Sequence, residues 1–319
     1  MRKLLSILII LLTLTSCSEK PLTENEFQMG TIITITAFDK VGKEHIEGCF
    51  DVIDEVDSLL DFHSEDSELG YLNANAHLAP LKVSDELYEL ISTAYDMTVL
   101  TGGAFNLAIG PLVELWDIGG LNARVPDSDE IESVLPLLDW NNIILDDNEK
   151  TVYFAIPGMK IDLGGIGKGY AADKVVEYLK ANGVEKALLN LGGNVYALGE
   201  KEKGTPWKVG IRKPEDESSE FFTVVEVSDE SVVTSGGYER YLIGEDGRRY
   251  HHILDSRTGY PAESDILSVT IVDESSTLSD VLSTATFALG SVEGKALLES
   301  LGVEGVFLLE DGSVVKVNP

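Results

Sequence analysis

The stretch from Lys160 to Val175, KIDLGGIGKGYAADKV, places four glycines around Lys168. Its pattern predicts a strand over Lys160–Leu163, a glycine-rich turn, and then a helix that runs through Gly169–Gly183. Because glycine lacks a Cβ, the backbone of such a turn can approach a ligand closely or adopt a positive φ. A lysine beside exposed backbone N–H groups is typical of a phosphate site. The stretch therefore indicates a phosphate compound as ligand, with a purely structural tight connection as the alternative.

Two familiar phosphate-binding motifs do not fit this stretch. A P-loop needs a glycine where Asp162 stands and a serine or threonine where Gly169 stands. A dinucleotide fingerprint needs a third glycine at the position of Tyr170. Any phosphate must therefore be held in another way.

The first residues predict export and lipid anchoring. Two basic residues precede the apolar run Leu4–Leu14, which is too short to span a membrane. The following LTSC resembles a bacterial lipobox, so we expect a signal peptide over residues 1–16 and lipid on Cys17. Residues 17–26 would form a tether, and the protein would lie on the membrane facing the periplasm or another extracytoplasmic space. An ordinary signal peptide with a chance cysteine is the alternative.

The net charge of −31 excludes whole classes of partner. So acidic a surface repels nucleic acid and anionic lipid head groups. A few local cations must therefore hold any anionic substrate, and the lipid must provide the attachment to the membrane. Cys49 lies among apolar residues at helical spacing and is predicted to be an inert core thiol.

Residues 27–319 are predicted to form one interwoven α+β domain with mainly antiparallel sheets and packed helices. Helices and strands alternate irregularly, which argues against a regular βαβ array. Asp127 and Glu130 have the spacing of a capping box at a helix start. A hairpin is expected around Asp147-Asn148, and HSEDSELGYLNANA is expected to be a surface loop. Further strands are expected at MGTIITITAF, KALLNLGG, WKVGIR, FFTVVEV, SVVTSGG and LSVTIVDE, with helices at DELYELISTAYDMTVL, TLSDVLSTATFALG and VEGKALLESLG and a final hairpin at GVFLLEDGSVVKV.

A metal pair is indicated on the helix TLSDVLSTATF. Asp280 and Thr284 are four residues apart, so their side chains share one helical face. A carboxylate and a hydroxyl suit a hard cation such as Mg²⁺. The alternative is an exposed aspartate and a half-buried threonine on an ordinary amphipathic helix.

The segment HHILDSRTGYP gathers chemically versatile side chains within a short span. His252 is a candidate for proton transfer because imidazole titrates near neutral pH. Arg257 is a candidate to hold phosphate in a bidentate manner. A polar turn closed by Thr258-Gly259 is the alternative.

Together and in order, these pieces resemble the ApbE family of flavin transferases, which use FAD as donor. The resemblance runs from Met29 to about Gly290 and rests on GTIITI, DSELGYLN, FNLAIGPLVELW, IDLGGIGKGYAAD, LNLGGN, TSGGYERY, HHILDSRTGYP and SDVLSTATF. It implies a fold of that family, with a T-fold-like arrangement of sheets and helices.

The resemblance also implies a role for individual residues. A Mg²⁺ ion would be held by Asp280, Thr284 and the backbone carbonyl of Gly165. The family often has aspartate at the position of Asn106, and an aromatic flavin contact for which Phe62 and His63 both remain candidates. The family's flavin and nucleotide contacts fall on Met29, Ala104, Phe105, Asn106, Asp162, Lys168 and Leu254.

The activity that the resemblance implies is Mg²⁺-dependent transfer of FMN from FAD to a threonine or serine hydroxyl of a target protein, with release of AMP. His252 would orient or deprotonate that hydroxyl. Expected acceptors are subunits of membrane electron-transfer complexes, of the Rnf or sodium-pumping NADH:quinone reductase type, or exported flavoproteins. Two alternatives stay open: an FAD pyrophosphatase that gives FMN and AMP, and a flavin-binding lipoprotein without chemistry.

Overall fold

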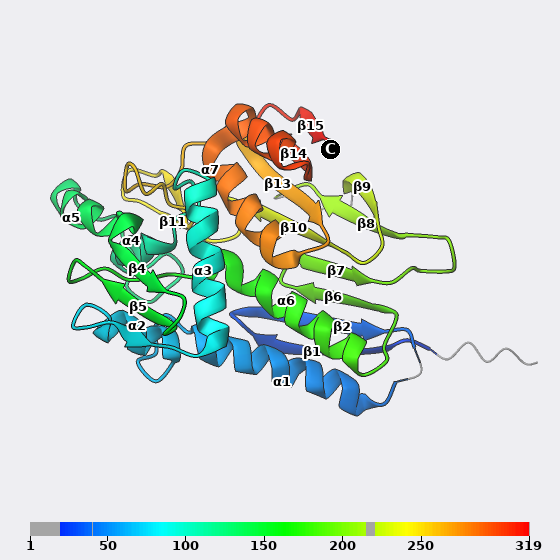
Figure 1. The fold of residues 1–319 in the computed structure, drawn as a ribbon. Coiled ribbons are helices and arrows are strands. Elements are labelled where there is room, and N and C mark those ends of the chain that lie inside the picture. Colours follow the sequence, from blue (N-terminus) through cyan, green and yellow to red (C-terminus); the bar gives the residue numbers. More distant parts are fainter. Residues whose placement is uncertain (1–19, 40, 215–220, 319) are drawn as a thin grey trace, which may run out of the picture.

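The main sheet takes strands from both ends of the chain. The computed structural model describes residues 20–39, 41–214 and 221–318. Its eight-stranded sheet has the order β1-β2-β6-β7-β10-β13-β14-β15, and each neighbouring pair is antiparallel (Figure 1). The strands are β1 (Leu22–Gln28), β2 (Thr31–Ala37), β6 (Ala187–Leu191), β7 (Asn194–Leu198), β10 (Glu230–Gly236), β13 (Ile266–Asp273), β14 (Glu304–Leu309) and β15 (Val314–Val317).

Helices and a hairpin cover the two faces of this sheet. On one face, α6 packs against both α1 and α7 (Figure 1). Tyr196 of β7 points into the apolar cluster beneath α1 and α6, whereas its neighbour Ala197 points into a second cluster around Trp207. That second cluster lies under the hairpin of β8 and β9. The elements are α1 (Lys43–Leu60), α6 (Gly164–Ala181), α7 (Ser276–Leu301), β8 (Trp207–Arg212) and β9 (Phe221–Val227).

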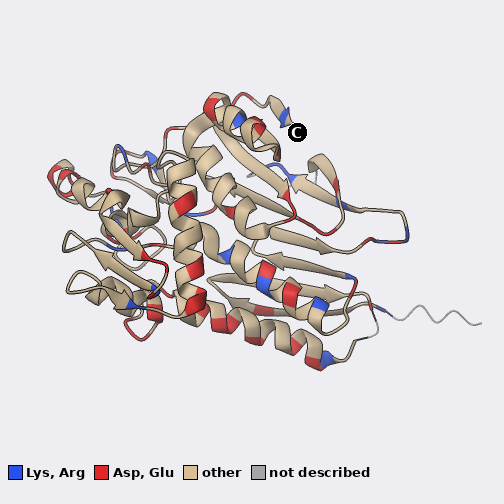
Figure 2. Ribbon diagram, in the orientation of Figure 1, with Lys and Arg blue, Asp and Glu red and all other residues tan. Residues whose placement is uncertain are grey.

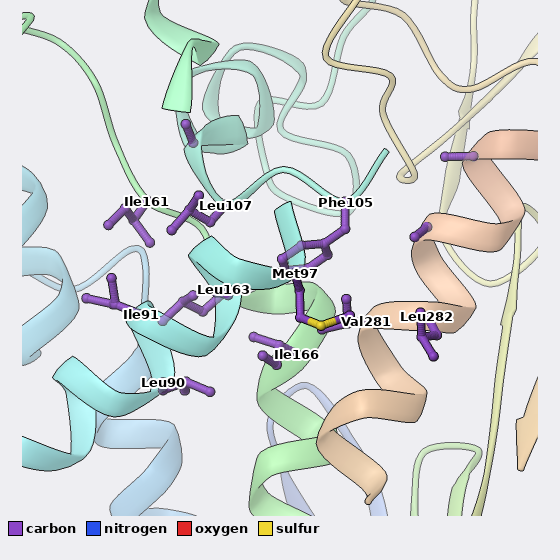
Figure 3. Packing of buried hydrophobic residues seen from close by; sticks show 14 of the residues in the cluster. Leu90, Ile91, Met97, Phe105, Leu107, Ile161, Leu163, Ile166, Val281 and Leu282 are labelled. Atoms are coloured by element: carbon purple, nitrogen blue, oxygen red, sulfur yellow. The ribbon is translucent and has the colours of Figure 1, made fainter. Parts of the chain in front are cut away.

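A third cluster joins these helices to a smaller group of elements. Met97 of α3, Ile166 of α6 and Val281 of α7 meet in the core between the three helices (Figure 3). The smaller group consists of α2 (Glu68–Asn75), α3 (Asp85–Leu100), α4 (Gly110–Trp116), α5 (Ser128–Val134), β3 (Leu81–Lys82), β4 (Ile143–Asp146), β5 (Thr151–Phe154), β11 (Tyr241–Ile243), β12 (Arg249–His251), and short 3₁₀ helices at Leu107–Ile109, Leu135–Leu138 and Trp140–Asn142.

The α6–α7 contact explains much of the stretch quoted first. A Cβ on Gly169 would lie 2.3 Å from the Ser276 carbonyl oxygen, so only glycine allows this approach. One turn later, the Asp173 carboxylate accepts hydrogen bonds from the backbone N–H groups of Ser276 and Thr277, both at 2.9 Å. It thereby caps the positive end of α7 from the neighbouring helix.

Three sequence predictions need correction. The expected tether is wrong in part, because Leu22–Gln28 pairs along β2 as the edge strand β1. Lys160–Leu163 is not a strand, and the glycines are not a turn; α6 begins at Gly164 and contains them. The expected surface loop contains α2, which begins where the Ser67 hydroxyl accepts a hydrogen bond from Gly70 N.

Other predictions are confirmed. The sheets are antiparallel and the fold is α+β. The capping box of Asp127 and Glu130 forms at the start of α5. Cys49 is buried, and burial raises the pKa of its thiol to about 12. The two helices expected after β13 form as one element, α7, with a kink at Gly290, whose φ is +79°.

Acidic residues recur along the helices α1 and α3 (Figure 2). Among the helices that the structure describes, none combines the length and apolarity needed to cross a membrane. The predicted signal peptide over residues 1–16 and the predicted lipidation site, Cys17, lie outside the described residues.

We predict that Gly169→Ala lowers the free energy of unfolding by about 1–3 kcal/mol, because the added methyl group must push α6 away from α7. Urea unfolding of the purified protein measures this. Gly164→Ala is the control, since its Cβ would meet only the tip of the Asp162 side chain, at 3.1 Å. Equal stability of the two variants would contradict the close contact.

Candidate active site

The predicted metal-binding residues come together where α6 meets α7. Asp280 is only 3% exposed, and its Oδ2 accepts a hydrogen bond of 2.9 Å from Gly169 N. Thr284 lies one turn further along α7. A Cβ built on Gly165 would lie 3.5 Å from Thr284 Oγ1, which puts the backbone of Gly165 against that hydroxyl. The structure thus brings Asp280, Thr284 and Gly165 to one place.

The hydrogen bond to Asp280 also affects the Gly165 carbonyl. In a regular α-helix, the N–H of Gly169 would donate to the carbonyl of Gly165, four residues earlier. Here that N–H donates to Asp280 Oδ2, which weakens the hold of the helix on the Gly165 oxygen. A carbonyl, a carboxylate and a hydroxyl are all hard oxygen donors that suit Mg²⁺.

These residues therefore fit a magnesium ion that keeps water or substrate oxygens as its other ligands. Within the described ranges, no three His, Cys, Asp or Glu side chains gather as they would around a metal held by protein alone. The predicted set agrees with this, because only one of its members, Asp280, belongs to these residue types. A site with so few protein ligands needs a ligand that brings oxygens of its own.

Met29 and Asp162 border the start of α6. Met29 has a left-handed backbone (φ +49°) and donates its N–H to Asp57 Oδ2 at 3.2 Å. Its Cε would lie 3.8 Å from a Cβ on Gly167. Asp162 Oδ1 accepts a hydrogen bond from Gly164 N at 2.9 Å. Burial raises the pKa of Asp162, and the Gly164 hydrogen bond and the nearby His63 act against this rise.

Phe105 covers the glycines from the other side. Its Cε2 would lie 3.2 Å from a Cβ on Gly165, and its side chain is 4% exposed. Ala104, its neighbour, is half-buried. A larger residue than glycine at position 165 would press into this ring, so Phe105 and the metal-binding residues share one compact site.

Asn106 and Leu254 direct their side chains into the protein. Asn106 Nδ2 donates to Leu138 O at 3.0 Å, and its Oδ1 accepts from Ala108 N at 2.9 Å. Leu254 packs in the cluster that contains Trp116 and Ile131. Through its side chain each residue therefore supports the site, and the backbone remains the group with which it can contact a ligand.

His252 is held in one tautomer by a backbone carbonyl. The oxygen of Arg240 accepts from His252 N at 3.1 Å and lies 3.2 Å from His252 Nδ1. Because a carbonyl can only accept, Nδ1 carries the proton and Nε2 of the neutral ring has a free lone pair. Burial lowers the pKa of His252 to about 4, and the positive charges of Arg240 and Lys168 also lower it. His252 is therefore a neutral proton acceptor at pH 7.

His251 has a different environment from its neighbour. Its Nε2 lies 3.1 Å from Ala262 O, and its ring meets Phe287 edge-on with centroids 5.3 Å apart. Burial lowers its pKa as well. The two histidines thus face different partners, and only His252 lies beside Lys168 and Arg240.

The phosphate-binding hypothesis for Arg257 does not hold. Its guanidinium pairs with the carboxylate of Asp255 through Nε–Oδ1 and Nη2–Oδ2 contacts, each of 2.9 Å. The two residues of this ion pair belong to the same turn, and the negative charge of Asp255 already balances the positive charge of Arg257. Lys168, by contrast, is half-buried on α6 and has no ion-pair partner in the part of the chain that the structure describes. Lys168 is thus the better candidate for an anionic ligand.

Sequence reasoning missed Arg240 and Asp173, which position other groups. Arg240 holds His252 through its carbonyl, and Asp173 caps α7 and so fixes Asp280. Arg240 lies in the motif TSGGYERY and Asp173 lies in the motif IDLGGIGKGYAAD. Their place in these motifs was the only feature of the sequence that pointed to them. Because every residue has a backbone carbonyl, the amino-acid type at position 240 could not reveal this contact.

A sequence model of the ApbE family matches residues 29–307. The chain belongs to the ApbE family. It is similar to two proteins named FAD:protein FMN transferase. It is 39% identical to that of Klebsiella pneumoniae (strain 342) over 271 residues, which are 85% of this chain and 84% of the relative. It is also 39% identical to that of Treponema pallidum (strain Nichols) over 307 residues, 91% and 84% of the two chains.

Solved ApbE structures share the fold. The crystal structure of the ApbE protein from Thermotoga maritima has a TM-score of 0.85 at 33% identity, and covers 93% of this chain and 97% of its own. The flavin transferase ApbE from Vibrio cholerae has a TM-score of 0.83 at 28% identity, and covers 93% and 96%. The predicted family and fold class are confirmed.

We predict that Asn106→Asp destabilises this protein at pH 7 by about 1–3 kcal/mol. An ionised carboxylate cannot donate to Leu138 O, so the folded state favours the protonated form and raises the pKa of the new side chain. The unfolded chain then loses the proton first as pH rises, and stability falls from about pH 4 towards neutrality.

Urea unfolding at pH 5 and pH 7.5 measures this loss. Asn148→Asp is the matched control, because Asn148 is exposed in the turn between β4 and β5. If Asn106→Asp follows the pH dependence of the control, the hydrogen bond to Leu138 O does not support the site.

Proposed function

We propose that the protein transfers FMN from FAD to a threonine or serine hydroxyl of another protein in a Mg²⁺-dependent reaction. The observation that carries the proposal is the meeting of Asp280, Thr284 and Gly165 beside Lys168 and His252, in a member of the ApbE family. The relatives' name, FAD:protein FMN transferase, gives the donor and the class of acceptor.

The reaction breaks one phosphoanhydride bond and forms one phosphoester bond. The acceptor oxygen attacks the phosphorus that carries riboflavin, and AMP leaves with the electron pair of the broken P–O bond. The proton of the acceptor hydroxyl goes to His252 Nε2, which is unprotonated because Nδ1 is held at Arg240 O. The products are the flavinylated protein and AMP.

The residues of the α6–α7 contact would bind the pyrophosphate end of FAD. Asp280, Thr284 and the Gly165 carbonyl would hold Mg²⁺, and Lys168 would balance the remaining phosphate charge. When bound, Mg²⁺ polarises phosphate oxygens and offsets the charge that develops on them. Phe105, Met29 and the other predicted contacts would orient the flavin and the nucleotide.

The experiment that tests the proposal is mass spectrometry of a threonine-bearing acceptor after incubation with the protein, FAD and Mg²⁺. Covalent FMN on the acceptor, with one AMP released per FMN attached, supports transfer. AMP release without acceptor would instead identify an FAD pyrophosphatase. Intact FAD after long incubation with acceptor and Mg²⁺ would identify a flavin-binding protein without this chemistry.

We predict that Asp280→Ala abolishes Mg²⁺ binding and transfer but leaves the fold intact. A buried carboxylate without its cation is costly, so its removal does not unfold the protein. Calorimetric titration with Mg²⁺ in the presence of FAD measures the binding, and thermal unfolding measures the fold. Asp311→Ala, in the exposed turn after β14, is the control. Wild-type transfer by Asp280→Ala at limiting Mg²⁺ would refute the metal assignment.

We predict that His252→Ala slows transfer by about 10²–10⁴-fold, the usual contribution of a positioned base. FAD affinity should stay within a few-fold, because Mg²⁺ and Lys168 hold the pyrophosphate. His251→Ala is the control. If FAD affinity falls in step with the rate, His252 is a binding residue.

The pKa of His252 adds a second test. Since it is lowered to about 4, the base stays unprotonated as pH falls from 7 to about 5, and kcat/KM for transfer should remain nearly level over that range. Half-loss of kcat/KM near pH 6.5, removed by His252→Ala, would show an ordinary histidine pKa instead.

The lipobox motivates a proposal for location. We infer that lipid on Cys17 anchors the protein to the membrane on its extracytoplasmic side, where acceptors in Rnf-type or sodium-pumping NADH:quinone reductase complexes, or exported flavoproteins, would be met. Two or more acyl chains give stable anchoring that one chain does not. Cys17→Ser should move the protein from the membrane fraction to the soluble fraction without loss of transfer activity. Retention on membranes after a salt wash would show another anchor.

A further inference from the structure

Arg240 forms no salt bridge in the part of the chain that the structure describes. Burial raises the pKa of its neighbour Glu239, and the positive charges of Lys168 and Arg240 act against that rise. The chain has 55 acidic residues against 24 lysines and arginines, yet the exposed Arg240 guanidinium forms no ion pair within the described ranges. Its Nη2 would lie 3.7 Å from a Cβ on Gly30, and its Cδ would lie 3.8 Å from one on Gly119. The side chain therefore rests between two glycine-containing turns and keeps its charge available.

Large apolar side chains lie exposed on both of those turns. Phe27 and Ile32 are direct cross-strand partners in β1 and β2, next to the turn that holds Gly30, and they are 73% and 66% exposed. They lie on the sheet face opposite the buried Ile33. Leu121, two residues after Gly119, is 102% exposed. Exposed apolar groups that cluster around a charged residue mark interaction sites.

We propose that these four residues, Phe27, Ile32, Leu121 and Arg240, form a docking surface for the acceptor protein. We call them the mouth patch. An apolar side chain of the acceptor would pack on Phe27, Ile32 and Leu121, and a carboxylate close to the modified threonine or serine would pair with Arg240. The proposal rests on the proposed function and adds the chemistry of the segment that the enzyme recognises.

The position of the mouth patch favours the acceptor as its occupant. The acceptor hydroxyl must reach His252 Nε2, and the other ring nitrogen of His252, Nδ1, is hydrogen-bonded to the backbone carbonyl of Arg240. Met29, in the same turn as Gly30, borders the start of α6. A protein bound over Arg240 would therefore have its surface next to His252, where its hydroxyl reacts.

Charge argues against other occupants. An anionic bilayer or a second copy of a chain of net charge −31 would be repelled. An acidic side chain of the acceptor would be attracted by Arg240, which is exposed and forms no salt bridge within residues 20–39, 41–214 and 221–318. Arginine and aromatic side chains are also the groups that most often dominate protein–protein binding.

The experiment is steady-state transfer to the soluble domain of a flavin-bearing subunit from a sodium-pumping NADH:quinone reductase, with covalent FMN as the readout. In the double variant Phe27→Thr/Ile32→Thr, threonine keeps the strand propensity of β1 and β2. We expect this variant, and separately Arg240→Gln, to raise KM for the acceptor by about tenfold or more, while the dissociation constant of FAD stays within twofold. Val292→Thr is the control, since Val292 is 81% exposed on the distant half of α7.

The outcomes separate the proposal from the proposed function. Covalent FMN formed by the wild type establishes transfer; an unchanged acceptor KM in the mouth-patch variants then overturns the docking surface alone. Weaker FAD binding by Arg240→Gln, with an unchanged acceptor KM, would assign Arg240 to the nucleotide and overturn its role here. Loss of binding of the lipid-free double variant to anionic vesicles, at unchanged acceptor KM, would make the patch a membrane contact and also overturn the proposal.

Discussion

The close approach of α6 and α7 at Gly169 is the constraint on which the site depends. Gly169 packs against Ser276, and its backbone N–H donates to the Asp280 carboxylate. The packing of α6 against α7 therefore also sets the orientation of that carboxylate. Asp173 then fixes the start of α7 from the side of α6. A displacement of one helix by an ångström would separate Asp280 from Gly165 and would also release the α7 cap. Rigid elements of this kind hold reactive groups more accurately than loops.

The distribution of charge complements this rigidity. Acidic residues recur along α1 and α3 (Figure 2). Lys168 and Arg240 both lie near enough to His252 for their positive charges to lower its pKa. The two cations disfavour a positive imidazole, and the Arg240 carbonyl decides which ring nitrogen carries the proton. The protein thus keeps a neutral base close to Lys168, the cation proposed for the phosphates of the substrate, and to Arg240, the cation proposed for the acceptor protein. Because the protein as a whole is strongly negative, an anionic substrate can be attracted only by the positive side chains of the site itself.

Much of the architecture could be predicted from sequence, and the failures have physical causes. The buried face of α1 was readable because Ile46, Cys49 and Phe50 recur at helical spacing. The edge strand β1 was not, since LTENEFQ is polar and owes its strand conformation to pairing with β2. The glycines of α6 suggested a turn because the role of Gly169, close approach to Ser276, involves a segment more than a hundred residues away. Residue types nominated His252 and Asp280, but only the structure could give the Arg240 carbonyl that selects the His252 tautomer or the Gly169 N–H that orients the Asp280 carboxylate.

The burial of Cys49 has a practical consequence for work on this protein. The chain contains two cysteines, and the thiolate of Cys49 is suppressed by an apolar core and a pKa of about 12. Maleimides and disulfide reagents react with thiolates, so the folded protein presents them no target at Cys49. A cysteine introduced on the surface of a variant without Cys17 would be its single reactive thiol. Fluorophores and spin labels could then be attached at one chosen position without removing any residue from the core.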